Sequence, residues 1–236
     1  MDTSRNCVIT GGTSGVGLAT AIQFAKRGDN VAICGRDQAR LDTARAKIEA
    51  ESTGVNILTF ETDLTQSHSG AAFIEYCATE FSSLDVLVNN ASFAPCAPID
   101  EMADDVIDAC ININVRSIYS ATKAAWKWMK SQQSGIIINV SSTAAVDPFP
   151  GFSPYGSTKA WIELFTVALA NEGREHNIRS YCVRPGAVET PMLRGLFADF
   201  PAEQCVSPEA VARLIDLTCH PGLSYSSGQT IKVSLQ

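Results

Sequence analysis

Short β-branched runs alternate with longer segments of helical pattern along nearly the whole chain of 236 residues. The runs predict strands at 6–10, 31–34, 55–61, 84–88, 135–140, 179–183 and 229–233. The segments between them predict helices from the turn after the first strand to residue 27, and at 37–51, 67–81, 102–130, 155–172 and 207–219. Parallel strands need long crossover connections, so this alternation favours a parallel sheet with helices on both faces. We expect one α/β domain over residues 1–236, a doubly wound sheet of about seven strands.

Composition and charge exclude several classes of protein. The formal net charge is −7 and the basic residues are scattered, which argues against a nucleic-acid surface. Residues 1–6 lack the pattern of a signal peptide, and the most apolar run, 136–140, is too short to cross a membrane. We therefore expect a cytoplasmic protein that binds neither nucleic acid nor membrane.

The cysteines and histidines indicate neither a disulfide framework nor a metal site. Eight cysteines occur without a C-x-x-C pair, so we expect them to be reduced and mostly buried. The three histidines, His68, His176 and His220, are far apart and show no metal-ligand spacing. No metal is expected.

A glycine-rich turn follows the first strand directly and precedes the first helix. It reads Thr10-Gly-Gly-Thr-Ser-Gly-Val-Gly17, with glycines at 11, 15 and 17. Glycines here permit a tight turn, a close approach of the backbone to a pyrophosphate, and close packing of a helix whose N-terminus faces the anion. A plain tight turn is the alternative. The position between a first strand and a helix favours nucleotide binding.

Six motifs in this order resemble those of the short-chain dehydrogenase/reductase family, and the resemblance covers nearly the whole chain. The resemblance implies a Rossmann-like fold and a hydride transfer between a nicotinamide cofactor and a carbonyl or alcohol group. The motifs are T-G-x-x-x-G-x-G at 10–17, Asp63-Leu64, Asn89-Asn90-Ala91-Ser92 (with serine where glycine is usual), Asn114-Val115, Ser142 with Tyr155-x-x-x-Lys159, and Pro185-Gly186-x-Val188-x-Thr190.

The resemblance implies a catalytic set of Asn114, Ser142, Tyr155 and Lys159. Tyr155 and Lys159 lie four apart and share a helix face, so a positive charge can sit beside the phenol. A free tyrosine has a pKa near about 10, and a nearby positive charge lowers it toward the working range. Tyr155 would be the general acid/base, and Ser142, rather than its neighbour Ser141, would donate to the substrate oxygen. Asn114 would hold a water that relays protons to Lys159.

The same resemblance implies a set of cofactor contacts. Asp63 and Leu64 would meet the adenine, Lys159 the nicotinamide ribose, and Val188 with Thr190 the carboxamide. The full expected set is Gly11, Thr13, Ser14, Gly15, Val16, Gly17, Arg36, Asp63, Leu64, Asn90, Ala91, Tyr155, Lys159, Pro185, Gly186, Val188 and Thr190.

The end of the second strand predicts NADP(H), with NAD(H) less favoured. An acidic residue there would bind the ribose hydroxyls and repel a 2′-phosphate, but the chain has Gly35 followed by Arg36. An arginine offers a planar set of donors for that phosphate. Asp37 complicates this prediction, although as the N-cap of the next helix its carboxylate can turn toward backbone amides. The alternative is that Arg36 is a solvated surface residue.

The sequence says less about the identity of the substrate than about the type of reaction. Phe93, Phe149, Phe152, Met192 and Leu193 lie in loops expected near the nicotinamide, which favours a small, neutral, partly apolar carbonyl or alcohol substrate. No basic cluster marks a pocket for an anion or a carrier protein, although Arg194 could serve one.

The oligomeric state and the function each have alternatives. The chain ends Val233-Ser-Leu-Gln236 instead of the family's V-D-G-G, which bears on an expected homodimer or homotetramer. The alternatives in function are an NAD-dependent alcohol dehydrogenase working in the oxidative direction and a non-catalytic cofactor sensor. The retained proton donor, Tyr155, counts against the sensor.

Overall fold

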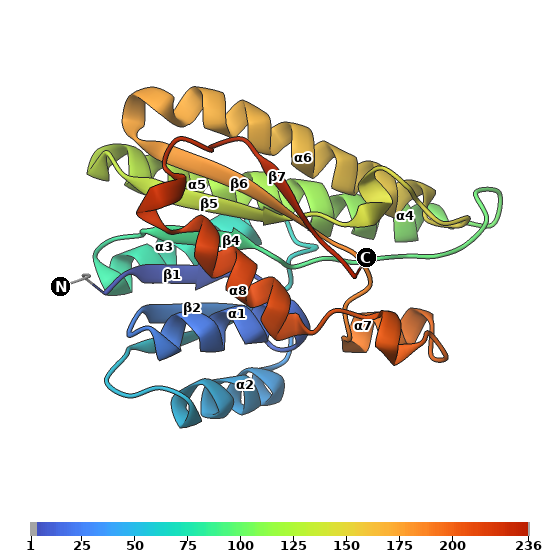
Figure 1. Ribbon diagram of the computed structural model, residues 1–236, viewed down its shortest axis with the longest axis horizontal. Coiled ribbons are helices and arrows are strands. Elements are labelled where there is room, and N and C mark those ends of the chain that lie inside the picture. The colour runs from blue at the N-terminus through green and yellow to red at the C-terminus, as the bar shows by residue number, and fades with distance from the viewer. Residues whose placement is uncertain (1–3, 236) are drawn as a thin grey trace.

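The sheet in the computed structural model, which describes residues 4–235, contains seven parallel strands (Figure 1). Their order across the sheet is β3-β2-β1-β4-β5-β6-β7. The strands are β1 (Asn6–Ile9), β2 (Asn30–Gly35), β3 (Ile57–Glu61), β4 (Val86–Asn89), β5 (Gly135–Val140), β6 (Ile178–Pro185) and β7 (Thr230–Val233). The chain winds outward in one direction through β2 and β3, then crosses to β4 and winds in the other. The predicted doubly wound, Rossmann-like sheet is confirmed.

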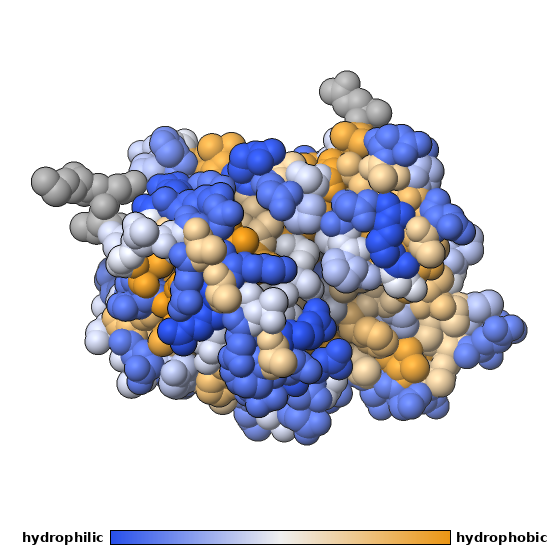
Figure 2. Space-filling model, turned by 90° about the horizontal axis from the view of Figure 1, so that it is seen from below, coloured by the Kyte–Doolittle hydropathy of each residue, from blue (hydrophilic) through white to orange (hydrophobic). Residues whose placement is uncertain are grey.

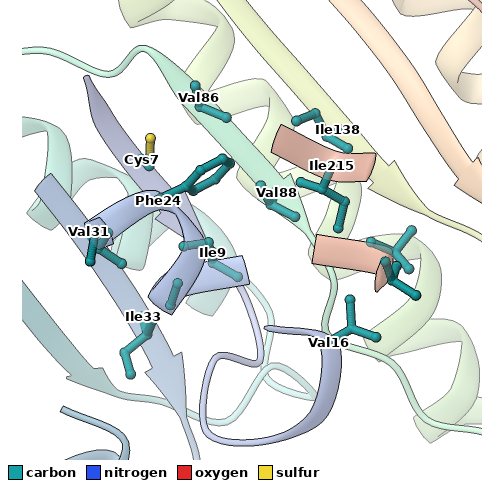
Figure 3. Close-up of a cluster of buried hydrophobic side chains, with 14 of the residues drawn as sticks. Cys7, Ile9, Val16, Phe24, Val31, Ile33, Val86, Val88, Ile138 and Ile215 are labelled. Atoms are coloured by element: carbon teal, nitrogen blue, oxygen red, sulfur yellow. The ribbon is translucent and has the colours of Figure 1, made fainter. Parts of the chain in front are cut away.

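Helices cover both faces of this sheet. One face carries α1 (Gly15–Lys26), α2 (Gln38–Ala50) and α8 (Pro208–Thr218), and the other carries α3 (Ser69–Phe81), α5 (Ser117–Gln132) and α6 (Ser153–Gly173). Alternate strand residues serve the two layers, so Cys7 and Ile9 pack in one cluster and Val8 in the other. Figure 3 shows Phe24 of α1 and Ile215 of α8 lying over the strand residues of the first cluster.

Helix ends form where the sequence places capping residues. The Asp37 carboxylate accepts a hydrogen bond from the backbone N–H of Arg40, and the Ser207 hydroxyl accepts one from that of Ala210. Gly28 has a φ of +88°, the left-handed conformation expected after the end of α1. These caps fix where α1, α2 and α8 meet the loops of the sheet.

The single helix expected over 102–130 is wrong in detail. It divides into α4 (Asp104–Ile111), a π-helical turn (Asn112–Arg116) and α5. In the π turn the N–H of Ser117 donates to the carbonyl of Asn112, five residues back, which inserts one extra residue. The side chain of Asn114, which lies in this turn, bonds to the loop after β4 instead of facing solvent.

A short helix, α7 (Pro191–Leu196), was not expected from the sequence. Thr190 caps it by accepting a hydrogen bond from the N–H of Leu193, and Pro191 occupies its first turn. The Thr-Pro pair was therefore a usable signal for this helix.

Six of the eight cysteines are buried free thiols, in line with expectation, whereas Cys96 is exposed and Cys205 is half-buried. Within residues 4–235 no helix is both long and apolar enough to cross a membrane. The first three of the N-terminal residues judged to lack a signal lie outside the described part of the chain.

Candidate active site

A cleft of about 1240 Å³ opens where the strands end at their carboxyl edge. Its walls come from the loops that follow β1 to β6, together with α7. In doubly wound sheets the loops after neighbouring strands part at the switch point, which here lies between β1 and β4, and this separation leaves a crevice. The sheet order therefore dictates the position of the cleft.

Most of the residues expected at a cofactor or catalytic site line this cleft. They are Gly11, Thr13, Ser14, Gly15, Val16, Arg36, Asp63, Leu64, Asn90, Ala91, Ser142, Tyr155, Lys159, Pro185, Gly186, Val188 and Thr190. Gly17 and Asn114 lie behind the wall. A Cβ on Gly17 would come within 2.3 Å of the Gly11 carbonyl oxygen, so Gly17 serves close packing of the turn. Asn114 is fully buried.

The turn after β1 forms a cradle suited to a pyrophosphate. Ser14 is extended and makes no capping hydrogen bond, so the first N–H groups of α1 receive no side-chain cap from it. Gly15 has a φ of +54°, which turns the chain into the helix beside the cleft. The free backbone N–H groups and the helix dipole at such an uncapped N-terminus attract an anion. The residues present therefore fit the pyrophosphate of a dinucleotide.

Tyr155, Ser142 and Lys159 come together on the wall between β5 and α6. Tyr155 and Lys159 are buried on one face of α6, and the Lys159 Nζ lies 5.6 Å from the centroid of the tyrosine ring. That ammonium donates a hydrogen bond of 2.9 Å to the carbonyl of Val140, at the end of β5. Ser141 also lines the cleft, but its hydroxyl is engaged by other partners, because it donates to the Lys159 carbonyl and lies 2.9 Å from a Glu163 carboxylate oxygen.

Burial and hydrogen bonds set the pKa of Tyr155 in the protein alone, and the expected effect of charge from Lys159 and a bound cofactor stays a prediction. Burial raises the pKa of Tyr155 above its usual value, and hydrogen bonds with Ser142 and Ser92 pull that pKa only partly back. Burial also lowers the pKa of Lys159 to about 8. In the protein alone, burial therefore outweighs the interactions that favour the phenolate, and the pKa of Tyr155 moves away from the neutral range.

Asn114 and Ser92 form a support behind Tyr155. The Asn114 side-chain oxygen accepts hydrogen bonds from the Phe93 N–H (2.9 Å) and the Ser92 hydroxyl (3.2 Å). Its amide nitrogen donates to the Phe93 carbonyl and the Thr158 hydroxyl. The side chain thereby joins the loop after β4 to α6, and its expected role in a water relay stays a prediction. Ser92 was noted only as a departure from a motif, and its link to Tyr155 was missed.

Basic and acidic side chains both line the cleft at the end of β2, where Arg36, Asp37 and Arg40 lie. Arg36 lines the cleft, and the Asp37 carboxylate is engaged at the N-terminus of α2. A Cβ at Gly35 would lie 2.5 Å from Cγ2 of Thr13, so any larger residue there displaces Thr13. Arg40, which the sequence reasoning missed, also lines the cleft and donates to the Ser14 hydroxyl.

The other end of the cleft is aromatic. The rings of Phe149, Phe152 and Phe197 contact one another edge to face, with centroids 5.8–6.3 Å apart, and Phe152 contacts Tyr155 at 5.4 Å. Figure 2 shows apolar surface at the right-hand end of the molecule, the end at which α7 lies in Figure 1. Ser234 and Leu235 also line the cleft, so the unusual C-terminal residues contribute to it beside Gly186.

Comparison with known proteins decides the family. The model of the short chain dehydrogenase family matches residues 5–200. The chain belongs to the short-chain dehydrogenase/reductase family. It is therefore an oxidoreductase of a family that acts on alcohol and carbonyl groups of small molecules with NAD or NADP.

Relatives of this short-chain dehydrogenase/reductase match over almost their full length. It is 31% identical to the 3-oxoacyl-(acyl-carrier-protein) reductase FabG of Chlamydia trachomatis, over 98% of this chain and 96% of that protein. It is 30% identical to the human dehydrogenase/reductase SDR family member 4, over 98% and 86%. A 3-ketoacyl-(acyl-carrier-protein) reductase from Brucella melitensis, solved with NADH, superposes with a TM-score of 0.87 at 28% identity, over 98% and 96%.

Proposed function

We propose that this protein reduces a ketone or aldehyde on a small, neutral, partly apolar molecule with NADPH. The observation that carries the proposal is the junction in one cleft of a buried Tyr155 with an apolar aromatic wall. A phenol that keeps its proton at neutral pH is suited to protonate the oxygen of a carbonyl during reduction. The oxidative direction needs the phenolate instead.

Three side chains divide the chemistry. When bound, the reduced nicotinamide supplies a hydride to the carbonyl carbon. Tyr155 gives its proton to the carbonyl oxygen, so the product is an alcohol. Ser142 donates a hydrogen bond to that oxygen and stabilises the negative charge that develops on it. Lys159, positioned by the Val140 carbonyl, offers positive charge beside Tyr155 and a donor to the nicotinamide ribose.

The preference for NADPH rests on the end of β2. Arg36 and Arg40 line the place where the adenosine ribose is expected, and although Asp37 also lines it, one oxygen of its carboxylate is engaged by the Arg40 N–H at the start of α2. Guanidinium groups form strong, charge-assisted hydrogen bonds with phosphate. We further propose that residues 1–236 act as one domain, as a homodimer or homotetramer in the cytoplasm.

A second candidate is the reduction of a 3-oxoacyl thioester, which the likeness to FabG favours. The cleft gives less support to it. Arg194, the one arginine of the lid segment 190–206, is engaged with Glu189 and two backbone carbonyls rather than offered to an anionic carrier.

The decisive experiment is a steady-state assay of kcat/KM with NADPH and NADH against a panel of carbonyl substrates. The panel contains neutral ketones, aldehydes and a 3-oxoacyl thioester, and the corresponding alcohols are assayed with NAD and NADP. We expect neutral ketones with NADPH to give the highest values. Higher efficiency with the thioester would favour the second candidate, and activity only on alcohols with NAD would establish the oxidative dehydrogenase. Cofactor binding without any turnover would indicate the sensor.

A further inference from the structure

Arg194, in α7, forms hydrogen bonds with three different residues of the segment around that helix. Its guanidinium forms a two-pronged ion pair with the carboxylate of Glu189, at the end of the loop after β6. The Nη1 group also donates to the carbonyls of Ala198 (3.0 Å) and Phe200 (2.6 Å). A single side chain thus ties the loop before α7 to the turn after it.

That turn carries two of the rings that face the cleft. Phe197 and Phe200 both line it, and the N–H of Phe197 donates to the Leu193 carbonyl at the end of α7. Because α7 has only six residues, its backbone hydrogen bonds alone give the turn little support. Arg194 adds side-chain hydrogen bonds to the carbonyls of Ala198 and Phe200, which follow Phe197 in this turn.

Phe197 meets rings from a segment more than forty residues earlier in the chain. Its ring lies 5.8 Å from that of Phe152 and 6.3 Å from that of Phe149, both edge to face. Phe149 is 60% exposed although it is a large apolar residue, so one side of this group stays open to a ligand. Phe152 in turn contacts the ring of Tyr155. The three phenylalanines therefore form an apolar wall that begins at the proton donor.

We propose that Arg194 determines substrate specificity by positioning this wall, and that the wall selects ketones bearing a flat aromatic substituent. The inference rests on the proposed carbonyl reduction. An aryl group can join the edge-to-face arrangement, and aromatic pairs are stabilised beyond the burial of their area. A saturated ring of the same size gains burial only. Arg194 is a positioning residue, since it reaches the substrate only through Phe197 and Phe200.

The test compares three ketones that differ in size and aromaticity, in the presence of NADPH. Acetophenone and cyclohexyl methyl ketone match in size and differ in aromaticity, and 2-butanone is too small to reach the wall. For the parent protein we expect kcat/KM to fall in that order, with about a 3- to 10-fold step between the two ring ketones. In Arg194→Ala we expect KM for acetophenone to rise by about 10-fold, while kcat/KM for 2-butanone changes by less than about 2-fold.

Two further variants and one control separate positioning from general damage. Phe197→Ala keeps Arg194 and should reproduce the selective loss for acetophenone. Arg213→Ala, at an exposed position on α8, should behave as the parent protein. The affinity for NADPH and the melting temperature of each variant are measured alongside.

Each result has a definite reading. Equal losses for acetophenone and 2-butanone in Arg194→Ala, or no loss for either, would overturn the inference while leaving carbonyl reduction intact. Absence of turnover with every carbonyl in the parent protein would instead refute the proposed function. Binding of acetophenone to the NADPH complex of Tyr155→Phe, measured by calorimetry, gives a readout that does not depend on turnover. Loss of that binding when Arg194→Ala is added supports the inference, and unchanged binding contradicts it.

Discussion

The two ends of the cleft are built by different means. At the cofactor end the backbone leaves no room: a Cβ at Gly17 or Gly35 would come within 2.5 Å of a neighbouring atom. At the substrate end the wall consists of side chains, with Phe149 and Met192 largely exposed and a Cβ at Gly195 meeting nothing within 4 Å. Steric crowding therefore dominates at the cofactor end. At the other end it is found at Gly156, whose Cβ would lie 2.6 Å from the Ala144 carbonyl oxygen, while the aromatic wall itself depends on contacts between distant side chains. Substitutions should accordingly affect the fold and cofactor affinity at one end, and selectivity at the other.

The largest effect is expected at the boundary between the two ends, in Tyr155→Phe. Only the hydroxyl is lost, so kcat should fall by about 10²–10⁴-fold, the usual contribution of general acid catalysis. The affinity for NADPH, measured by fluorescence titration, should stay within about 2-fold because the ring still packs against Phe152. Turnover within a few-fold of the parent protein would remove Tyr155 from the mechanism.

At the cofactor end, Arg36→Ala tests the proposed binding of a 2′-phosphate by this arginine. A charge-assisted hydrogen bond contributes about 1.5–3 kcal/mol, so we expect a preference for NADPH of roughly 10- to 100-fold that largely disappears in the variant. The measurement is kcat/KM with each reduced cofactor at the same substrate concentration. Arg40→Ala shows how much of the preference the second arginine carries. A parent protein that prefers NADH would contradict the assignment.

The variants Gly17→Ala and Gly195→Ala add one methyl group at each end of the cleft. They test directly whether the two ends differ in steric crowding. At Gly17 the methyl would meet the Gly11 carbonyl oxygen at 2.3 Å and the Asn90 amide at 2.5 Å, so we expect a destabilisation of about 1–3 kcal/mol and weaker NADPH binding. At Gly195, within α7, alanine should be neutral or stabilising by up to about 1 kcal/mol. Denaturant unfolding measures both. Similar values for the two variants would show that the ends do not differ in this way.

The smallest effect should come from Ser92→Gly, which restores the usual residue of the family motif. The hydrogen bond between Ser92 and Tyr155 lowers the pKa of the phenol, so its removal should raise that pKa. Alcohol oxidation needs the phenolate, and the rising limb of its pH profile should therefore move to higher pH. For ketone reduction the falling limb should move the same way. A shift to lower pH in either profile would contradict the contact.

The difference between the ends also explains what the sequence could predict. The glycine turn, the caps at Asp37 and Ser207 and the Tyr155–Lys159 pair depend on local spacing, and the structure places each of them as expected. The burial that raises the pKa of Tyr155 could not be predicted in this way, because it depends on tertiary packing. The π turn at Asn114 follows from bonds to Phe93, about twenty residues away.

The side-chain contacts of segment 190–206 were the least predictable part of the site. Arg194 was expected as a possible contact for an anion, yet its donors are engaged by Glu189 and the turn after α7. Neither spacing nor periodicity encodes such a set of bonds. Leu235 likewise reaches the cleft only because β7 ends beside Pro185 and Gly186.

The close approach of Gly35 to Thr13 also bears on how cofactor preference could change during evolution. Gaining an acidic residue at position 35 would favour NAD, but its Cβ would collide with Cγ2 of Thr13 at 2.5 Å. Thr13→Ser removes that methyl group and keeps the hydroxyl. With serine already at position 13 this contact is absent when aspartate arrives at position 35, whereas with threonine the side chain must first shift. The threonine methyl group therefore makes a change of coenzyme easier in one order of substitution than in the other.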